Sequence, residues 1–173
     1  MRGSGSAINK LILTRFFVIV ILVVLADQAS KEWIVAHFQL YDSMVIIPGF
    51  FNLTFLRNTG AAFSMFAGHP AWWRHFFFIG VCLIALVVIV LMERKLRRQN
   101  TWYEISLACI GGGALGNLID RIRYGSVVDF LDVYVTTHHW PVFNIADSAI
   151  TIGVTLFLLT QFLEDRRRQE RTE

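Results

Sequence analysis

Four apolar stretches, each about 20 residues long, constrain the fold of this chain more than any other feature. They cover residues 11–30, 72–92, 102–121 and 142–163. A helix of this length crosses the hydrocarbon core of a bilayer, because its own hydrogen bonds satisfy the backbone polar groups there. More than half of the residues are hydrophobic, a share that a soluble domain of this size rarely needs. We therefore expect an all-α membrane protein with four transmembrane helices.

Basic residues gather in two short segments, and these segments determine the predicted orientation. One is residues 93–98, between the second and third stretches, and the other is residues 165–168, after the fourth. Short loops rich in Lys and Arg stay on the cytoplasmic side of a membrane. We expect both termini in the cytoplasm and residues 31–71 and 122–141 outside. The sequence shows no basic patch interleaved with aromatic residues, which argues against a nucleic-acid partner.

The outer connection 31–71 contains a predicted strand. Residues 50–56 are aromatic and β-branched and partly alternate, as strands do, and residues 58–60 (NTG) predict a turn. We expect a small β element on the extracytoplasmic side, against the membrane surface. The chain then divides into residues 1–6, which we interpret as an expression-vector scar, a single membrane-embedded domain over residues 7–165, and a basic cytoplasmic tail over residues 166–173.

Unusual polar residues gather near the outer ends of the predicted helices. Ionisable groups at membrane depth are costly and usually face a cavity or a partner. Several of them, from different helices and at one level, indicate a site. The cytoplasmic half of each stretch is nearly pure Leu, Ile, Val and Phe. The outer polar residues are Asp27, Lys31, Arg57, Asn58, Asn117, Asp120, Arg121, Asp129, Asp132, Asn144 and Asp147.

Some of these residues have a structural explanation. Asp27 and Lys31 are four residues apart on one helix face, which favours an ion pair. We assign Lys31 to that role, while Asp27 remains equally open to a functional one. Arg121 follows Asn117 by four residues, so it has a partner within reach in Asn117 or in the neighbouring Asp120.

Asp147 and Asp129 lack such an explanation. Asp147 lies in the first turns of an apolar helix with no basic residue within a turn, and the N-cap role falls more naturally to Asn144. Asp129 lies in a short apolar run, residues 125–130, without a local cation. Carboxylates that are unpaired at this depth indicate a functional role.

Five separated blocks carry a family resemblance. They are residues 27–31 (DQASK), 57–64 (RNTGAAFS), 112–121 (GGALGNLIDR), 127–130 (VVDF) and 143–148 (FNIADS). In this order, and on four spans of the expected polarity, they resemble the lipoprotein signal peptidases, also called signal peptidase II, a family of bacterial aspartic intramembrane proteases. The resemblance covers almost the full length after residue 6. The visible departure is Trp140, where the family often has another aromatic or apolar residue.

The resemblance implies an activity and a location. Members of this family remove signal peptides from diacylglyceryl-modified bacterial prolipoproteins, cutting just before the lipidated cysteine, in the cytoplasmic (inner) membrane. It implies a catalytic dyad of Asp129 and Asp147 near the extracytoplasmic face, with no metal and no other cofactor. We expect the prolipoprotein and membrane lipid as partners, and a monomer. Around the dyad we expect substrate-binding or orienting roles for Asn58, Asn117, Arg121 and Asn144, and bracing roles for Asp27, Lys31 and Asp120.

Four alternatives fit parts of the sequence. A Ser/Lys protease would pair Lys31 with Ser30, Ser64 or Ser148. Asp27 would keep Lys31 protonated, however, and a general base must be free of its proton. A zinc protease would need H-E-x-x-H spacing, whereas His138 and His139 are adjacent. A proton-coupled transporter needs polar residues through the full membrane depth, and a passive scaffold leaves two locally unpaired aspartates unexplained.

Overall fold

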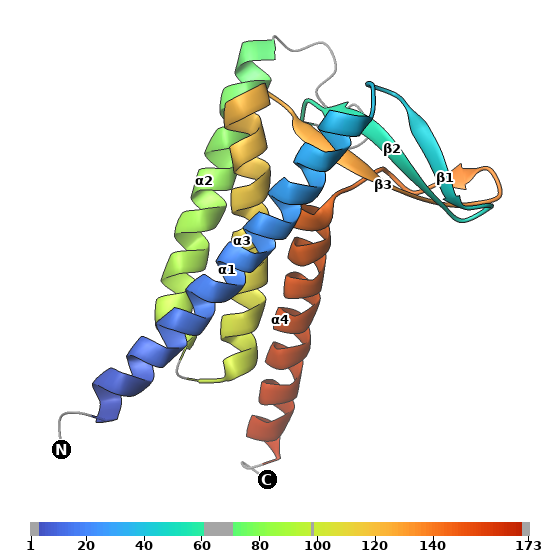
Figure 1. Ribbon diagram of the computed structural model, residues 1–173. Helices are drawn as coiled ribbons and strands as arrows, with labels where there is room; N and C mark the ends of the chain where they lie inside the picture. Colours follow the sequence, from blue (N-terminus) through green and yellow to red (C-terminus); the bar gives the residue numbers. More distant parts are fainter. Residues whose placement is uncertain (1–3, 61–70, 98, 171–173) are drawn as a thin grey trace.

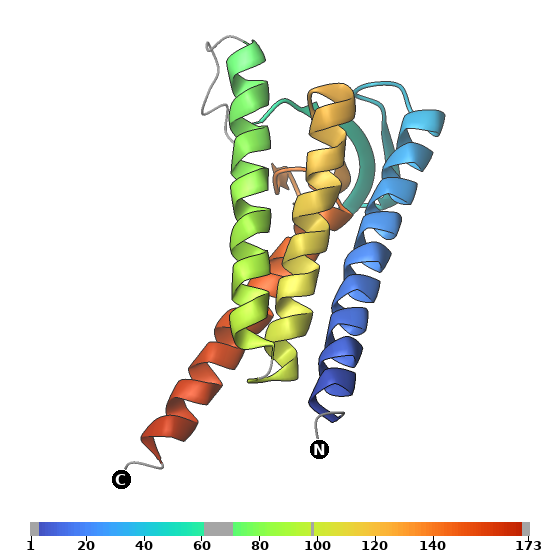
Figure 2. The ribbon, with the colours of Figure 1, turned by 90° about the vertical axis from the view of Figure 1, so that its left-hand side faces the viewer.

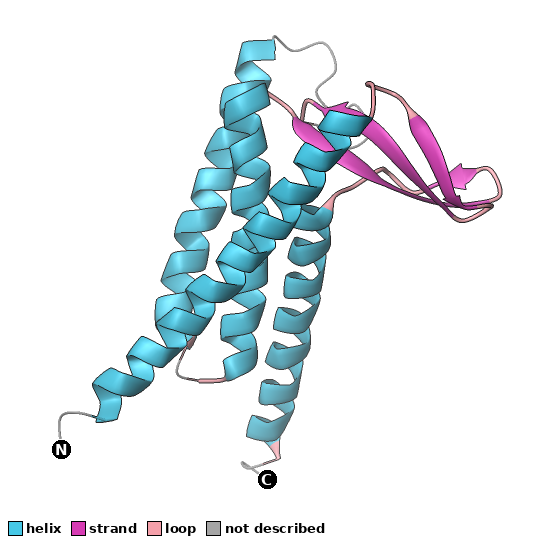
Figure 3. Ribbon diagram, in the orientation of Figure 1, coloured by secondary structure: helices cyan, strands magenta, loops and turns pink. Residues whose placement is uncertain are grey.

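The computed structural model describes residues 4–60, 71–97 and 99–170, as four long helices and a small antiparallel sheet (Figures 1 and 3). All four helices are long and apolar enough to cross a membrane, as the sequence predicts. The helices are α1 (Ser4–His37), α2 (Ala71–Leu96), α3 (Thr101–Tyr124) and α4 (Ile145–Gln169). The strands are β1 (Ser43–Ile47), β2 (Phe51–Asn58), β3 (Val127–Val135) and β4 (His138–His139).

The helix ends differ from the predicted spans. Helices α1, α2 and α3 extend beyond the apolar stretches at both ends, since a helix continues into water where polar residues allow it. The fourth span was expected from about residue 142, and α4 begins three residues later, at Ile145. Asn144 caps α4 in a capping box: its side chain accepts from the Asp147 amide (2.9 Å), and the Asp147 carboxylate accepts from the Asn144 amide (3.3 Å). Phe143 instead forms a β-bridge with Leu131 of β3.

Helix α3 is the centre of the bundle and packs against α1, α2 and α4. Figure 2 shows α3 between α2 and α1, with α4 crossing behind. The start of α1 and the end of α4 lie at the same end of the bundle, opposite the sheet (Figure 1). Glycines let α3 approach its neighbours: a Cβ at Gly112 would lie 2.8 Å from the Cβ of Val23 on α1, and a Cβ at Gly113 would overlap the carbonyl oxygen of Ala146 on α4.

Replacing Gly113 by alanine tests this close packing. We expect Gly113→Ala to destabilise the protein by about 1–3 kcal/mol, the usual cost of an overpacked contact, because backbone on α4 blocks the new methyl group. The melting temperature in detergent would measure the loss. Gly80→Ala on α2 is the matched control, since nothing lies within 4 Å of its Cβ position. Equal melting temperatures for the two variants would show that the α3–α4 contact tolerates a side chain.

The sheet has the strand order β1-β2-β3-β4, with antiparallel neighbours. The predicted strand at residues 50–56 is confirmed as β2, shifted slightly toward the C-terminus. Strands β3 and β4 were not expected in the outer connection 122–141. For β3 the reason is physical: its first four residues, Asp129 among them, are all buried, so the sequence lacks the apolar–polar alternation of a half-exposed strand.

Two buried apolar clusters hold these parts together. One, Phe16, Ile89, Leu107 and Ala108, joins α1, α2 and α3 near the end of the bundle that carries the chain termini. The other, Ile34, Phe55, Val128 and Phe130, fixes the sheet to the end of α1. Because successive side chains of a strand point to opposite faces, Asp129 lies on the face of β3 away from this second cluster.

Candidate active site

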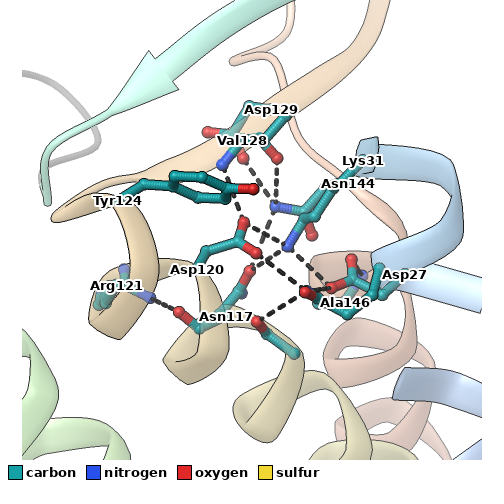
Figure 4. A network of polar contacts seen from close by, with 12 residues as sticks. Asp27, Lys31, Asn117, Asp120, Arg121, Tyr124, Val128, Asp129, Asn144 and Ala146 are labelled. Carbon is teal, nitrogen blue, oxygen red and sulfur yellow. Dashed lines mark hydrogen bonds and ion pairs between the residues drawn. The ribbon is translucent and has the colours of Figure 1, made fainter. Parts of the chain in front are cut away.

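Polar side chains from α1, α3, β3 and α4 meet where the helices reach the sheet (Figure 4). They lie far apart in sequence, and the fold brings them to one level of the bundle, as the sequence predicts. Burial distinguishes them from ordinary surface residues, because six of them have at most 6% of their surface exposed. These six are Asp27, Lys31, Asn117, Asp120, Asp129 and Asn144.

Lys31 is the centre of a buried ionic cluster. Its ammonium Nζ lies 2.8 Å from Oδ2 of Asp27 and 3.0 Å from Oδ2 of Asp120. It also donates to Oδ1 of Asn117 at 3.1 Å. The ion pair expected between Asp27 and Lys31 is present, and Asp120 from α3 joins it. One cation therefore serves two buried carboxylates.

The two carboxylates also hold neighbouring elements in place. Oδ1 of Asp27 accepts from the backbone amide of Ala146, in the first turn of α4, at 2.9 Å. Oδ2 of Asp120 accepts from the backbone amide of Val128, in β3, at 3.0 Å. The ionic cluster thus fixes the start of α4 and the strand that carries Asp129.

Asn144 connects the two aspartates that the sequence singles out. Its side chain is fully buried. Nδ2 donates to Oδ1 of Asp129 at 2.7 Å, while Oδ1 accepts from the amide of Asp147 in the cap of α4. One residue therefore contacts both carboxylates: the side chain of Asn144 binds that of Asp129, and its backbone amide donates to that of Asp147.

Asn117 joins this pair to the ionic cluster. Its Nδ2 donates to Oδ1 of Asp147 at 2.8 Å. Its Oδ1 accepts from Lys31 and, at 3.3 Å, from Nδ2 of Asn144. The amide is oriented by these contacts, because only its oxygen can face an ammonium and only its nitrogen can face a carboxylate.

Asp129 is buried and lies near a second carboxylate, that of Asp147. Burial, together with the negative charge of Asp147 nearby, raises the pKa of Asp129 from 3.8 to about 7. Hydrogen bonds from Asn58 and Asn144 act in the opposite direction. Nδ2 of Asn58 donates to Oδ2 of Asp129 at 3.0 Å, and its Oδ1 accepts from the amide of Gly60, closing the turn that follows β2.

A pocket of about 670 Å³ opens beside the two aspartates. Asn58, Asp129 and Asp147 give it polar groups on one side. Its other walls are largely apolar and come from the segment before α4 and from the first turns of that helix. They are Trp140, Pro141, Val142, Phe143, Ser148, Thr151 and Ile152. Two carboxylates therefore face a space that can admit a peptide and water.

A family model described as signal peptidase (SPase) II matches residues 19–163. The chain belongs to the signal peptidase II family. It is 48% identical over 148 residues to a lipoprotein signal peptidase of Syntrophus aciditrophicus, covering 86% of this chain and 91% of that one. It is 51% identical to one of Geobacter sulfurreducens, covering 82% and 88%. The resemblance read from the five sequence blocks is confirmed.

Solved structures agree with this signal peptidase II assignment. One bacterial membrane enzyme superposes with a TM-score of 0.75 at 33% identity, over 88% of this chain and 90% of that one. A second gives 0.73 at 34% identity, over 86% and 92%. The chain is accordingly a protease and a multi-pass bacterial membrane protein.

Arg121 bonds one of the two partners that its position in the sequence offers, the residue Asn117. Its Nη1 donates to the backbone oxygen of Asn117 at 3.1 Å and lies 3.9 Å from Sγ of Cys82, and its guanidinium stands 5.5 Å from the centre of the Phe78 ring. In the described part of the chain it pairs with neither Asp120 nor the two aspartates. It links α3 to α2 instead.

Two serines of the Ser/Lys alternative, Ser30 and Ser148, are engaged elsewhere. Oγ of Ser30 donates to the backbone oxygen of Asp27 at 2.8 Å, and Oγ of Ser148 donates to that of Asn144 at 2.9 Å. Ser64 lies outside the described residues. Lys31, between two carboxylates, is poorly suited to act as a base.

Asp132 was grouped with the outer polar residues but lies outside the site. Its carboxylate accepts from Asn52 and Thr54 of β2 and contacts Nδ1 of His139 at 2.7 Å. Burial alone would raise the pKa of Asp132, yet these contacts outweigh it and hold the pKa below the ordinary value.

The residues that form the pocket walls were not predicted from the sequence. The signal that could have indicated them is the aromatic pair Trp140 and Phe143, just before the cap of α4.

Proposed function

We propose that this signal peptidase II is an aspartic endopeptidase that removes signal peptides from diacylglyceryl-modified bacterial prolipoproteins and cuts just before the lipidated cysteine. Its relatives are named lipoprotein signal peptidases. The observation that carries the aspartic assignment is the pair Asp129 and Asp147, both held by Asn144 at the wall of one pocket.

The proposed reaction uses one water molecule and one shared proton. The ionised carboxylate of the dyad takes a proton from water, whose oxygen attacks the scissile carbonyl carbon. The protonated carboxyl donates a hydrogen bond to the carbonyl oxygen. When the C–N bond of the tetrahedral intermediate breaks, the leaving amine takes a proton from the dyad. Two carboxylates that cannot both ionise easily retain the required proton near neutral pH, and the dyad titrates as a unit.

The surrounding amides have positioning roles in this mechanism. Asn144 and Asn117 orient Asp129 and Asp147 through the contacts already given, and Asn58 holds the second oxygen of Asp129. The ionic cluster of Asp27, Lys31 and Asp120 braces the elements that carry the dyad. The apolar pocket walls suit a hydrophobic, lipid-modified substrate entering sideways from the bilayer. In this proposal the sheet lies on the extracytoplasmic side and both termini are cytoplasmic, as the basic segments predict.

A cleavage assay with a defined substrate tests the proposed function. The purified protein in lipid is incubated with a diacylglyceryl-modified prolipoprotein and, in parallel, with the same precursor lacking the lipid. We expect cleavage of the modified form, with mass spectrometry locating the cut just before the lipidated cysteine. In water enriched in ¹⁸O, one labelled oxygen should enter the new carboxyl group. Equal cleavage of both precursors, or a cut elsewhere, would contradict the proposed specificity.

The raised pKa of Asp129 gives a pH prediction. Above a pH of about 7 the dyad loses its shared proton, so it becomes doubly ionised and lacks an acid for the carbonyl oxygen. We expect kcat/KM to fall on the alkaline side with an apparent pKa near 7, by about tenfold per pH unit once well above it. Rates from pH 5.5 to 9 would measure this, with the melting temperature at each pH as the control for folding. A rate that stays constant to pH 9 would rule out the shared proton.

A further inference from the structure

A second pocket lies at the end of the bundle far from the dyad. It has a volume of about 450 Å³ and opens between the first part of α1 and the last turns of α2, the two helices that flank α3 in Figure 2. Its apolar wall comes from Leu13, Phe16 and Phe17 of α1 and from Val90 of α2. Its charged residues are Glu93 and Arg94, in the last turn of α2, and Arg97, just after that helix.

Glu93 is the unusual member of this pocket. Its side chain is only 4% exposed, and its Oε1 is buried without a hydrogen-bond partner among the residues that the structure describes. The neighbouring buried carboxylate, Glu104 of α3, differs because Arg15 of α1 donates to both of its oxygens. An ionised carboxylate that is buried without a partner is costly. Glu93 therefore lacks the cationic donor that Glu104 has.

The rim of the pocket has the opposite charge. Arg97 and Arg94 lie close enough to Glu93 to interact with it electrostatically. Arg94 is exposed and Arg97 half-buried, so both guanidinium groups have donors available at the surface. The pocket thus presents a carboxylate, two guanidinium groups one helical turn or less away, and an apolar wall. This is the pattern that complements an ammonium, a phosphate and an acyl chain within one molecule.

We propose that this pocket binds a phospholipid with a primary-amine headgroup, its ammonium on Glu93, its phosphate on Arg94 and Arg97, and an acyl chain along Leu13, Phe17 and Val90. The ethanolamine headgroup is short, so its two charges can reach groups one helical turn apart. The lipid comes from the leaflet at the basic end of the bundle. It fixes α1 against α2 at the end opposite the active site. The inference rests on the membrane fold alone and is independent of the proposed peptidase mechanism.

Native mass spectrometry of the full chain tests this site with three lipids of identical acyl chains: phosphatidylethanolamine, phosphatidylcholine and phosphatidylglycerol. Only the first has both a phosphate and a primary ammonium. We expect the parent protein to retain phosphatidylethanolamine about tenfold over phosphatidylcholine, the ratio that one charge-assisted hydrogen bond supplies. Tighter retention of phosphatidylglycerol would overturn the proposal, because it would indicate a general anionic-lipid site.

Three variants separate the contribution of Glu93 to lipid binding from that of Arg97. Glu93→Gln should bring the ethanolamine-to-choline ratio to about one, and Arg97→Gln should weaken binding of both lipids while keeping the ratio. Lys95→Gln is the matched control: Lys95 is an exposed basic residue on the same turn that does not line the pocket, so it should change neither. The melting temperature without lipid checks folding. An unchanged ratio in Glu93→Gln, or equal losses in Lys95→Gln and Arg97→Gln, would overturn the proposal.

Discussion

Replacing either Asp129 or Asp147 by asparagine is expected to lower kcat/KM by about 10³-fold or more while leaving the protein folded. Asparagine has nearly the same shape as aspartate but can neither accept the proton from water nor supply one to the leaving amine. The remaining aspartate cannot perform both roles, because the mechanism needs a base and an acid at the same time. The two variants should therefore be similarly inactive, and the double variant little worse than either.

Stability distinguishes this catalytic role from a structural one. Asp129 is buried near a like charge, and its raised pKa means that the fold disfavours the ionised form. Asp129→Asn removes that repulsion and sacrifices one hydrogen bond, so the melting temperature should stay close to that of the parent. Asp165→Asn, on an exposed turn of α4, is the control for loss of a carboxylate and should retain full activity. A dyad variant that keeps more than about a tenth of the activity would exclude the aspartic mechanism.

Local patterns were sufficient to predict much of this site. The sequence assigns the N-cap role to Asn144 rather than to Asp147, and the cap of α4 confirms this assignment. That cap places Asp147 beside Asn144. The lengths of the apolar stretches predict four helices, and the basic segments predict which ends lie together. These features depend on residues close in sequence, so they need no knowledge of the tertiary structure.

Contacts between distant elements were not predictable in the same way. Nothing near Asp129 in sequence indicates that Asn58 would reach it, since that contact depends on the register of β2 against β3. Strand β3 itself was missed because its buried residues lack alternation. Arg121 bonds the backbone of Asn117, which is near in sequence, but its contacts with Phe78 and Cys82 depend on the packing of α2 against α3. The sequence thus predicts which polar residues gather at one level of the bundle, and the packing of the elements selects their partners.

Replacing Lys31 by methionine is expected to cause the largest loss of stability, about 3–5 kcal/mol. Methionine fills a similar volume but leaves Asp27 and Asp120 as buried carboxylates without their shared cation. The loss would appear as a lower melting temperature in detergent. Glu32→Gln, at the next position of α1, is the control: it breaks the ion pair with Arg123, in which both side chains are about half exposed, and should leave the melting temperature unchanged.

Neutralising the whole cluster should restore what Lys31→Met removes. Combined with Asp27→Asn and Asp120→Asn, Lys31→Met leaves no charge in this cluster, and each asparagine keeps one oxygen for the backbone amide that its aspartate binds. We expect the triple variant to recover most of the melting temperature and, with it, measurable cleavage, because Lys31 acts only through the position of α4 and β3. A Ser/Lys protease would behave differently, since a stable protein without its lysine base would stay inactive. Recovered stability without any recovered activity would therefore contradict the bracing role and return Lys31 to the chemistry.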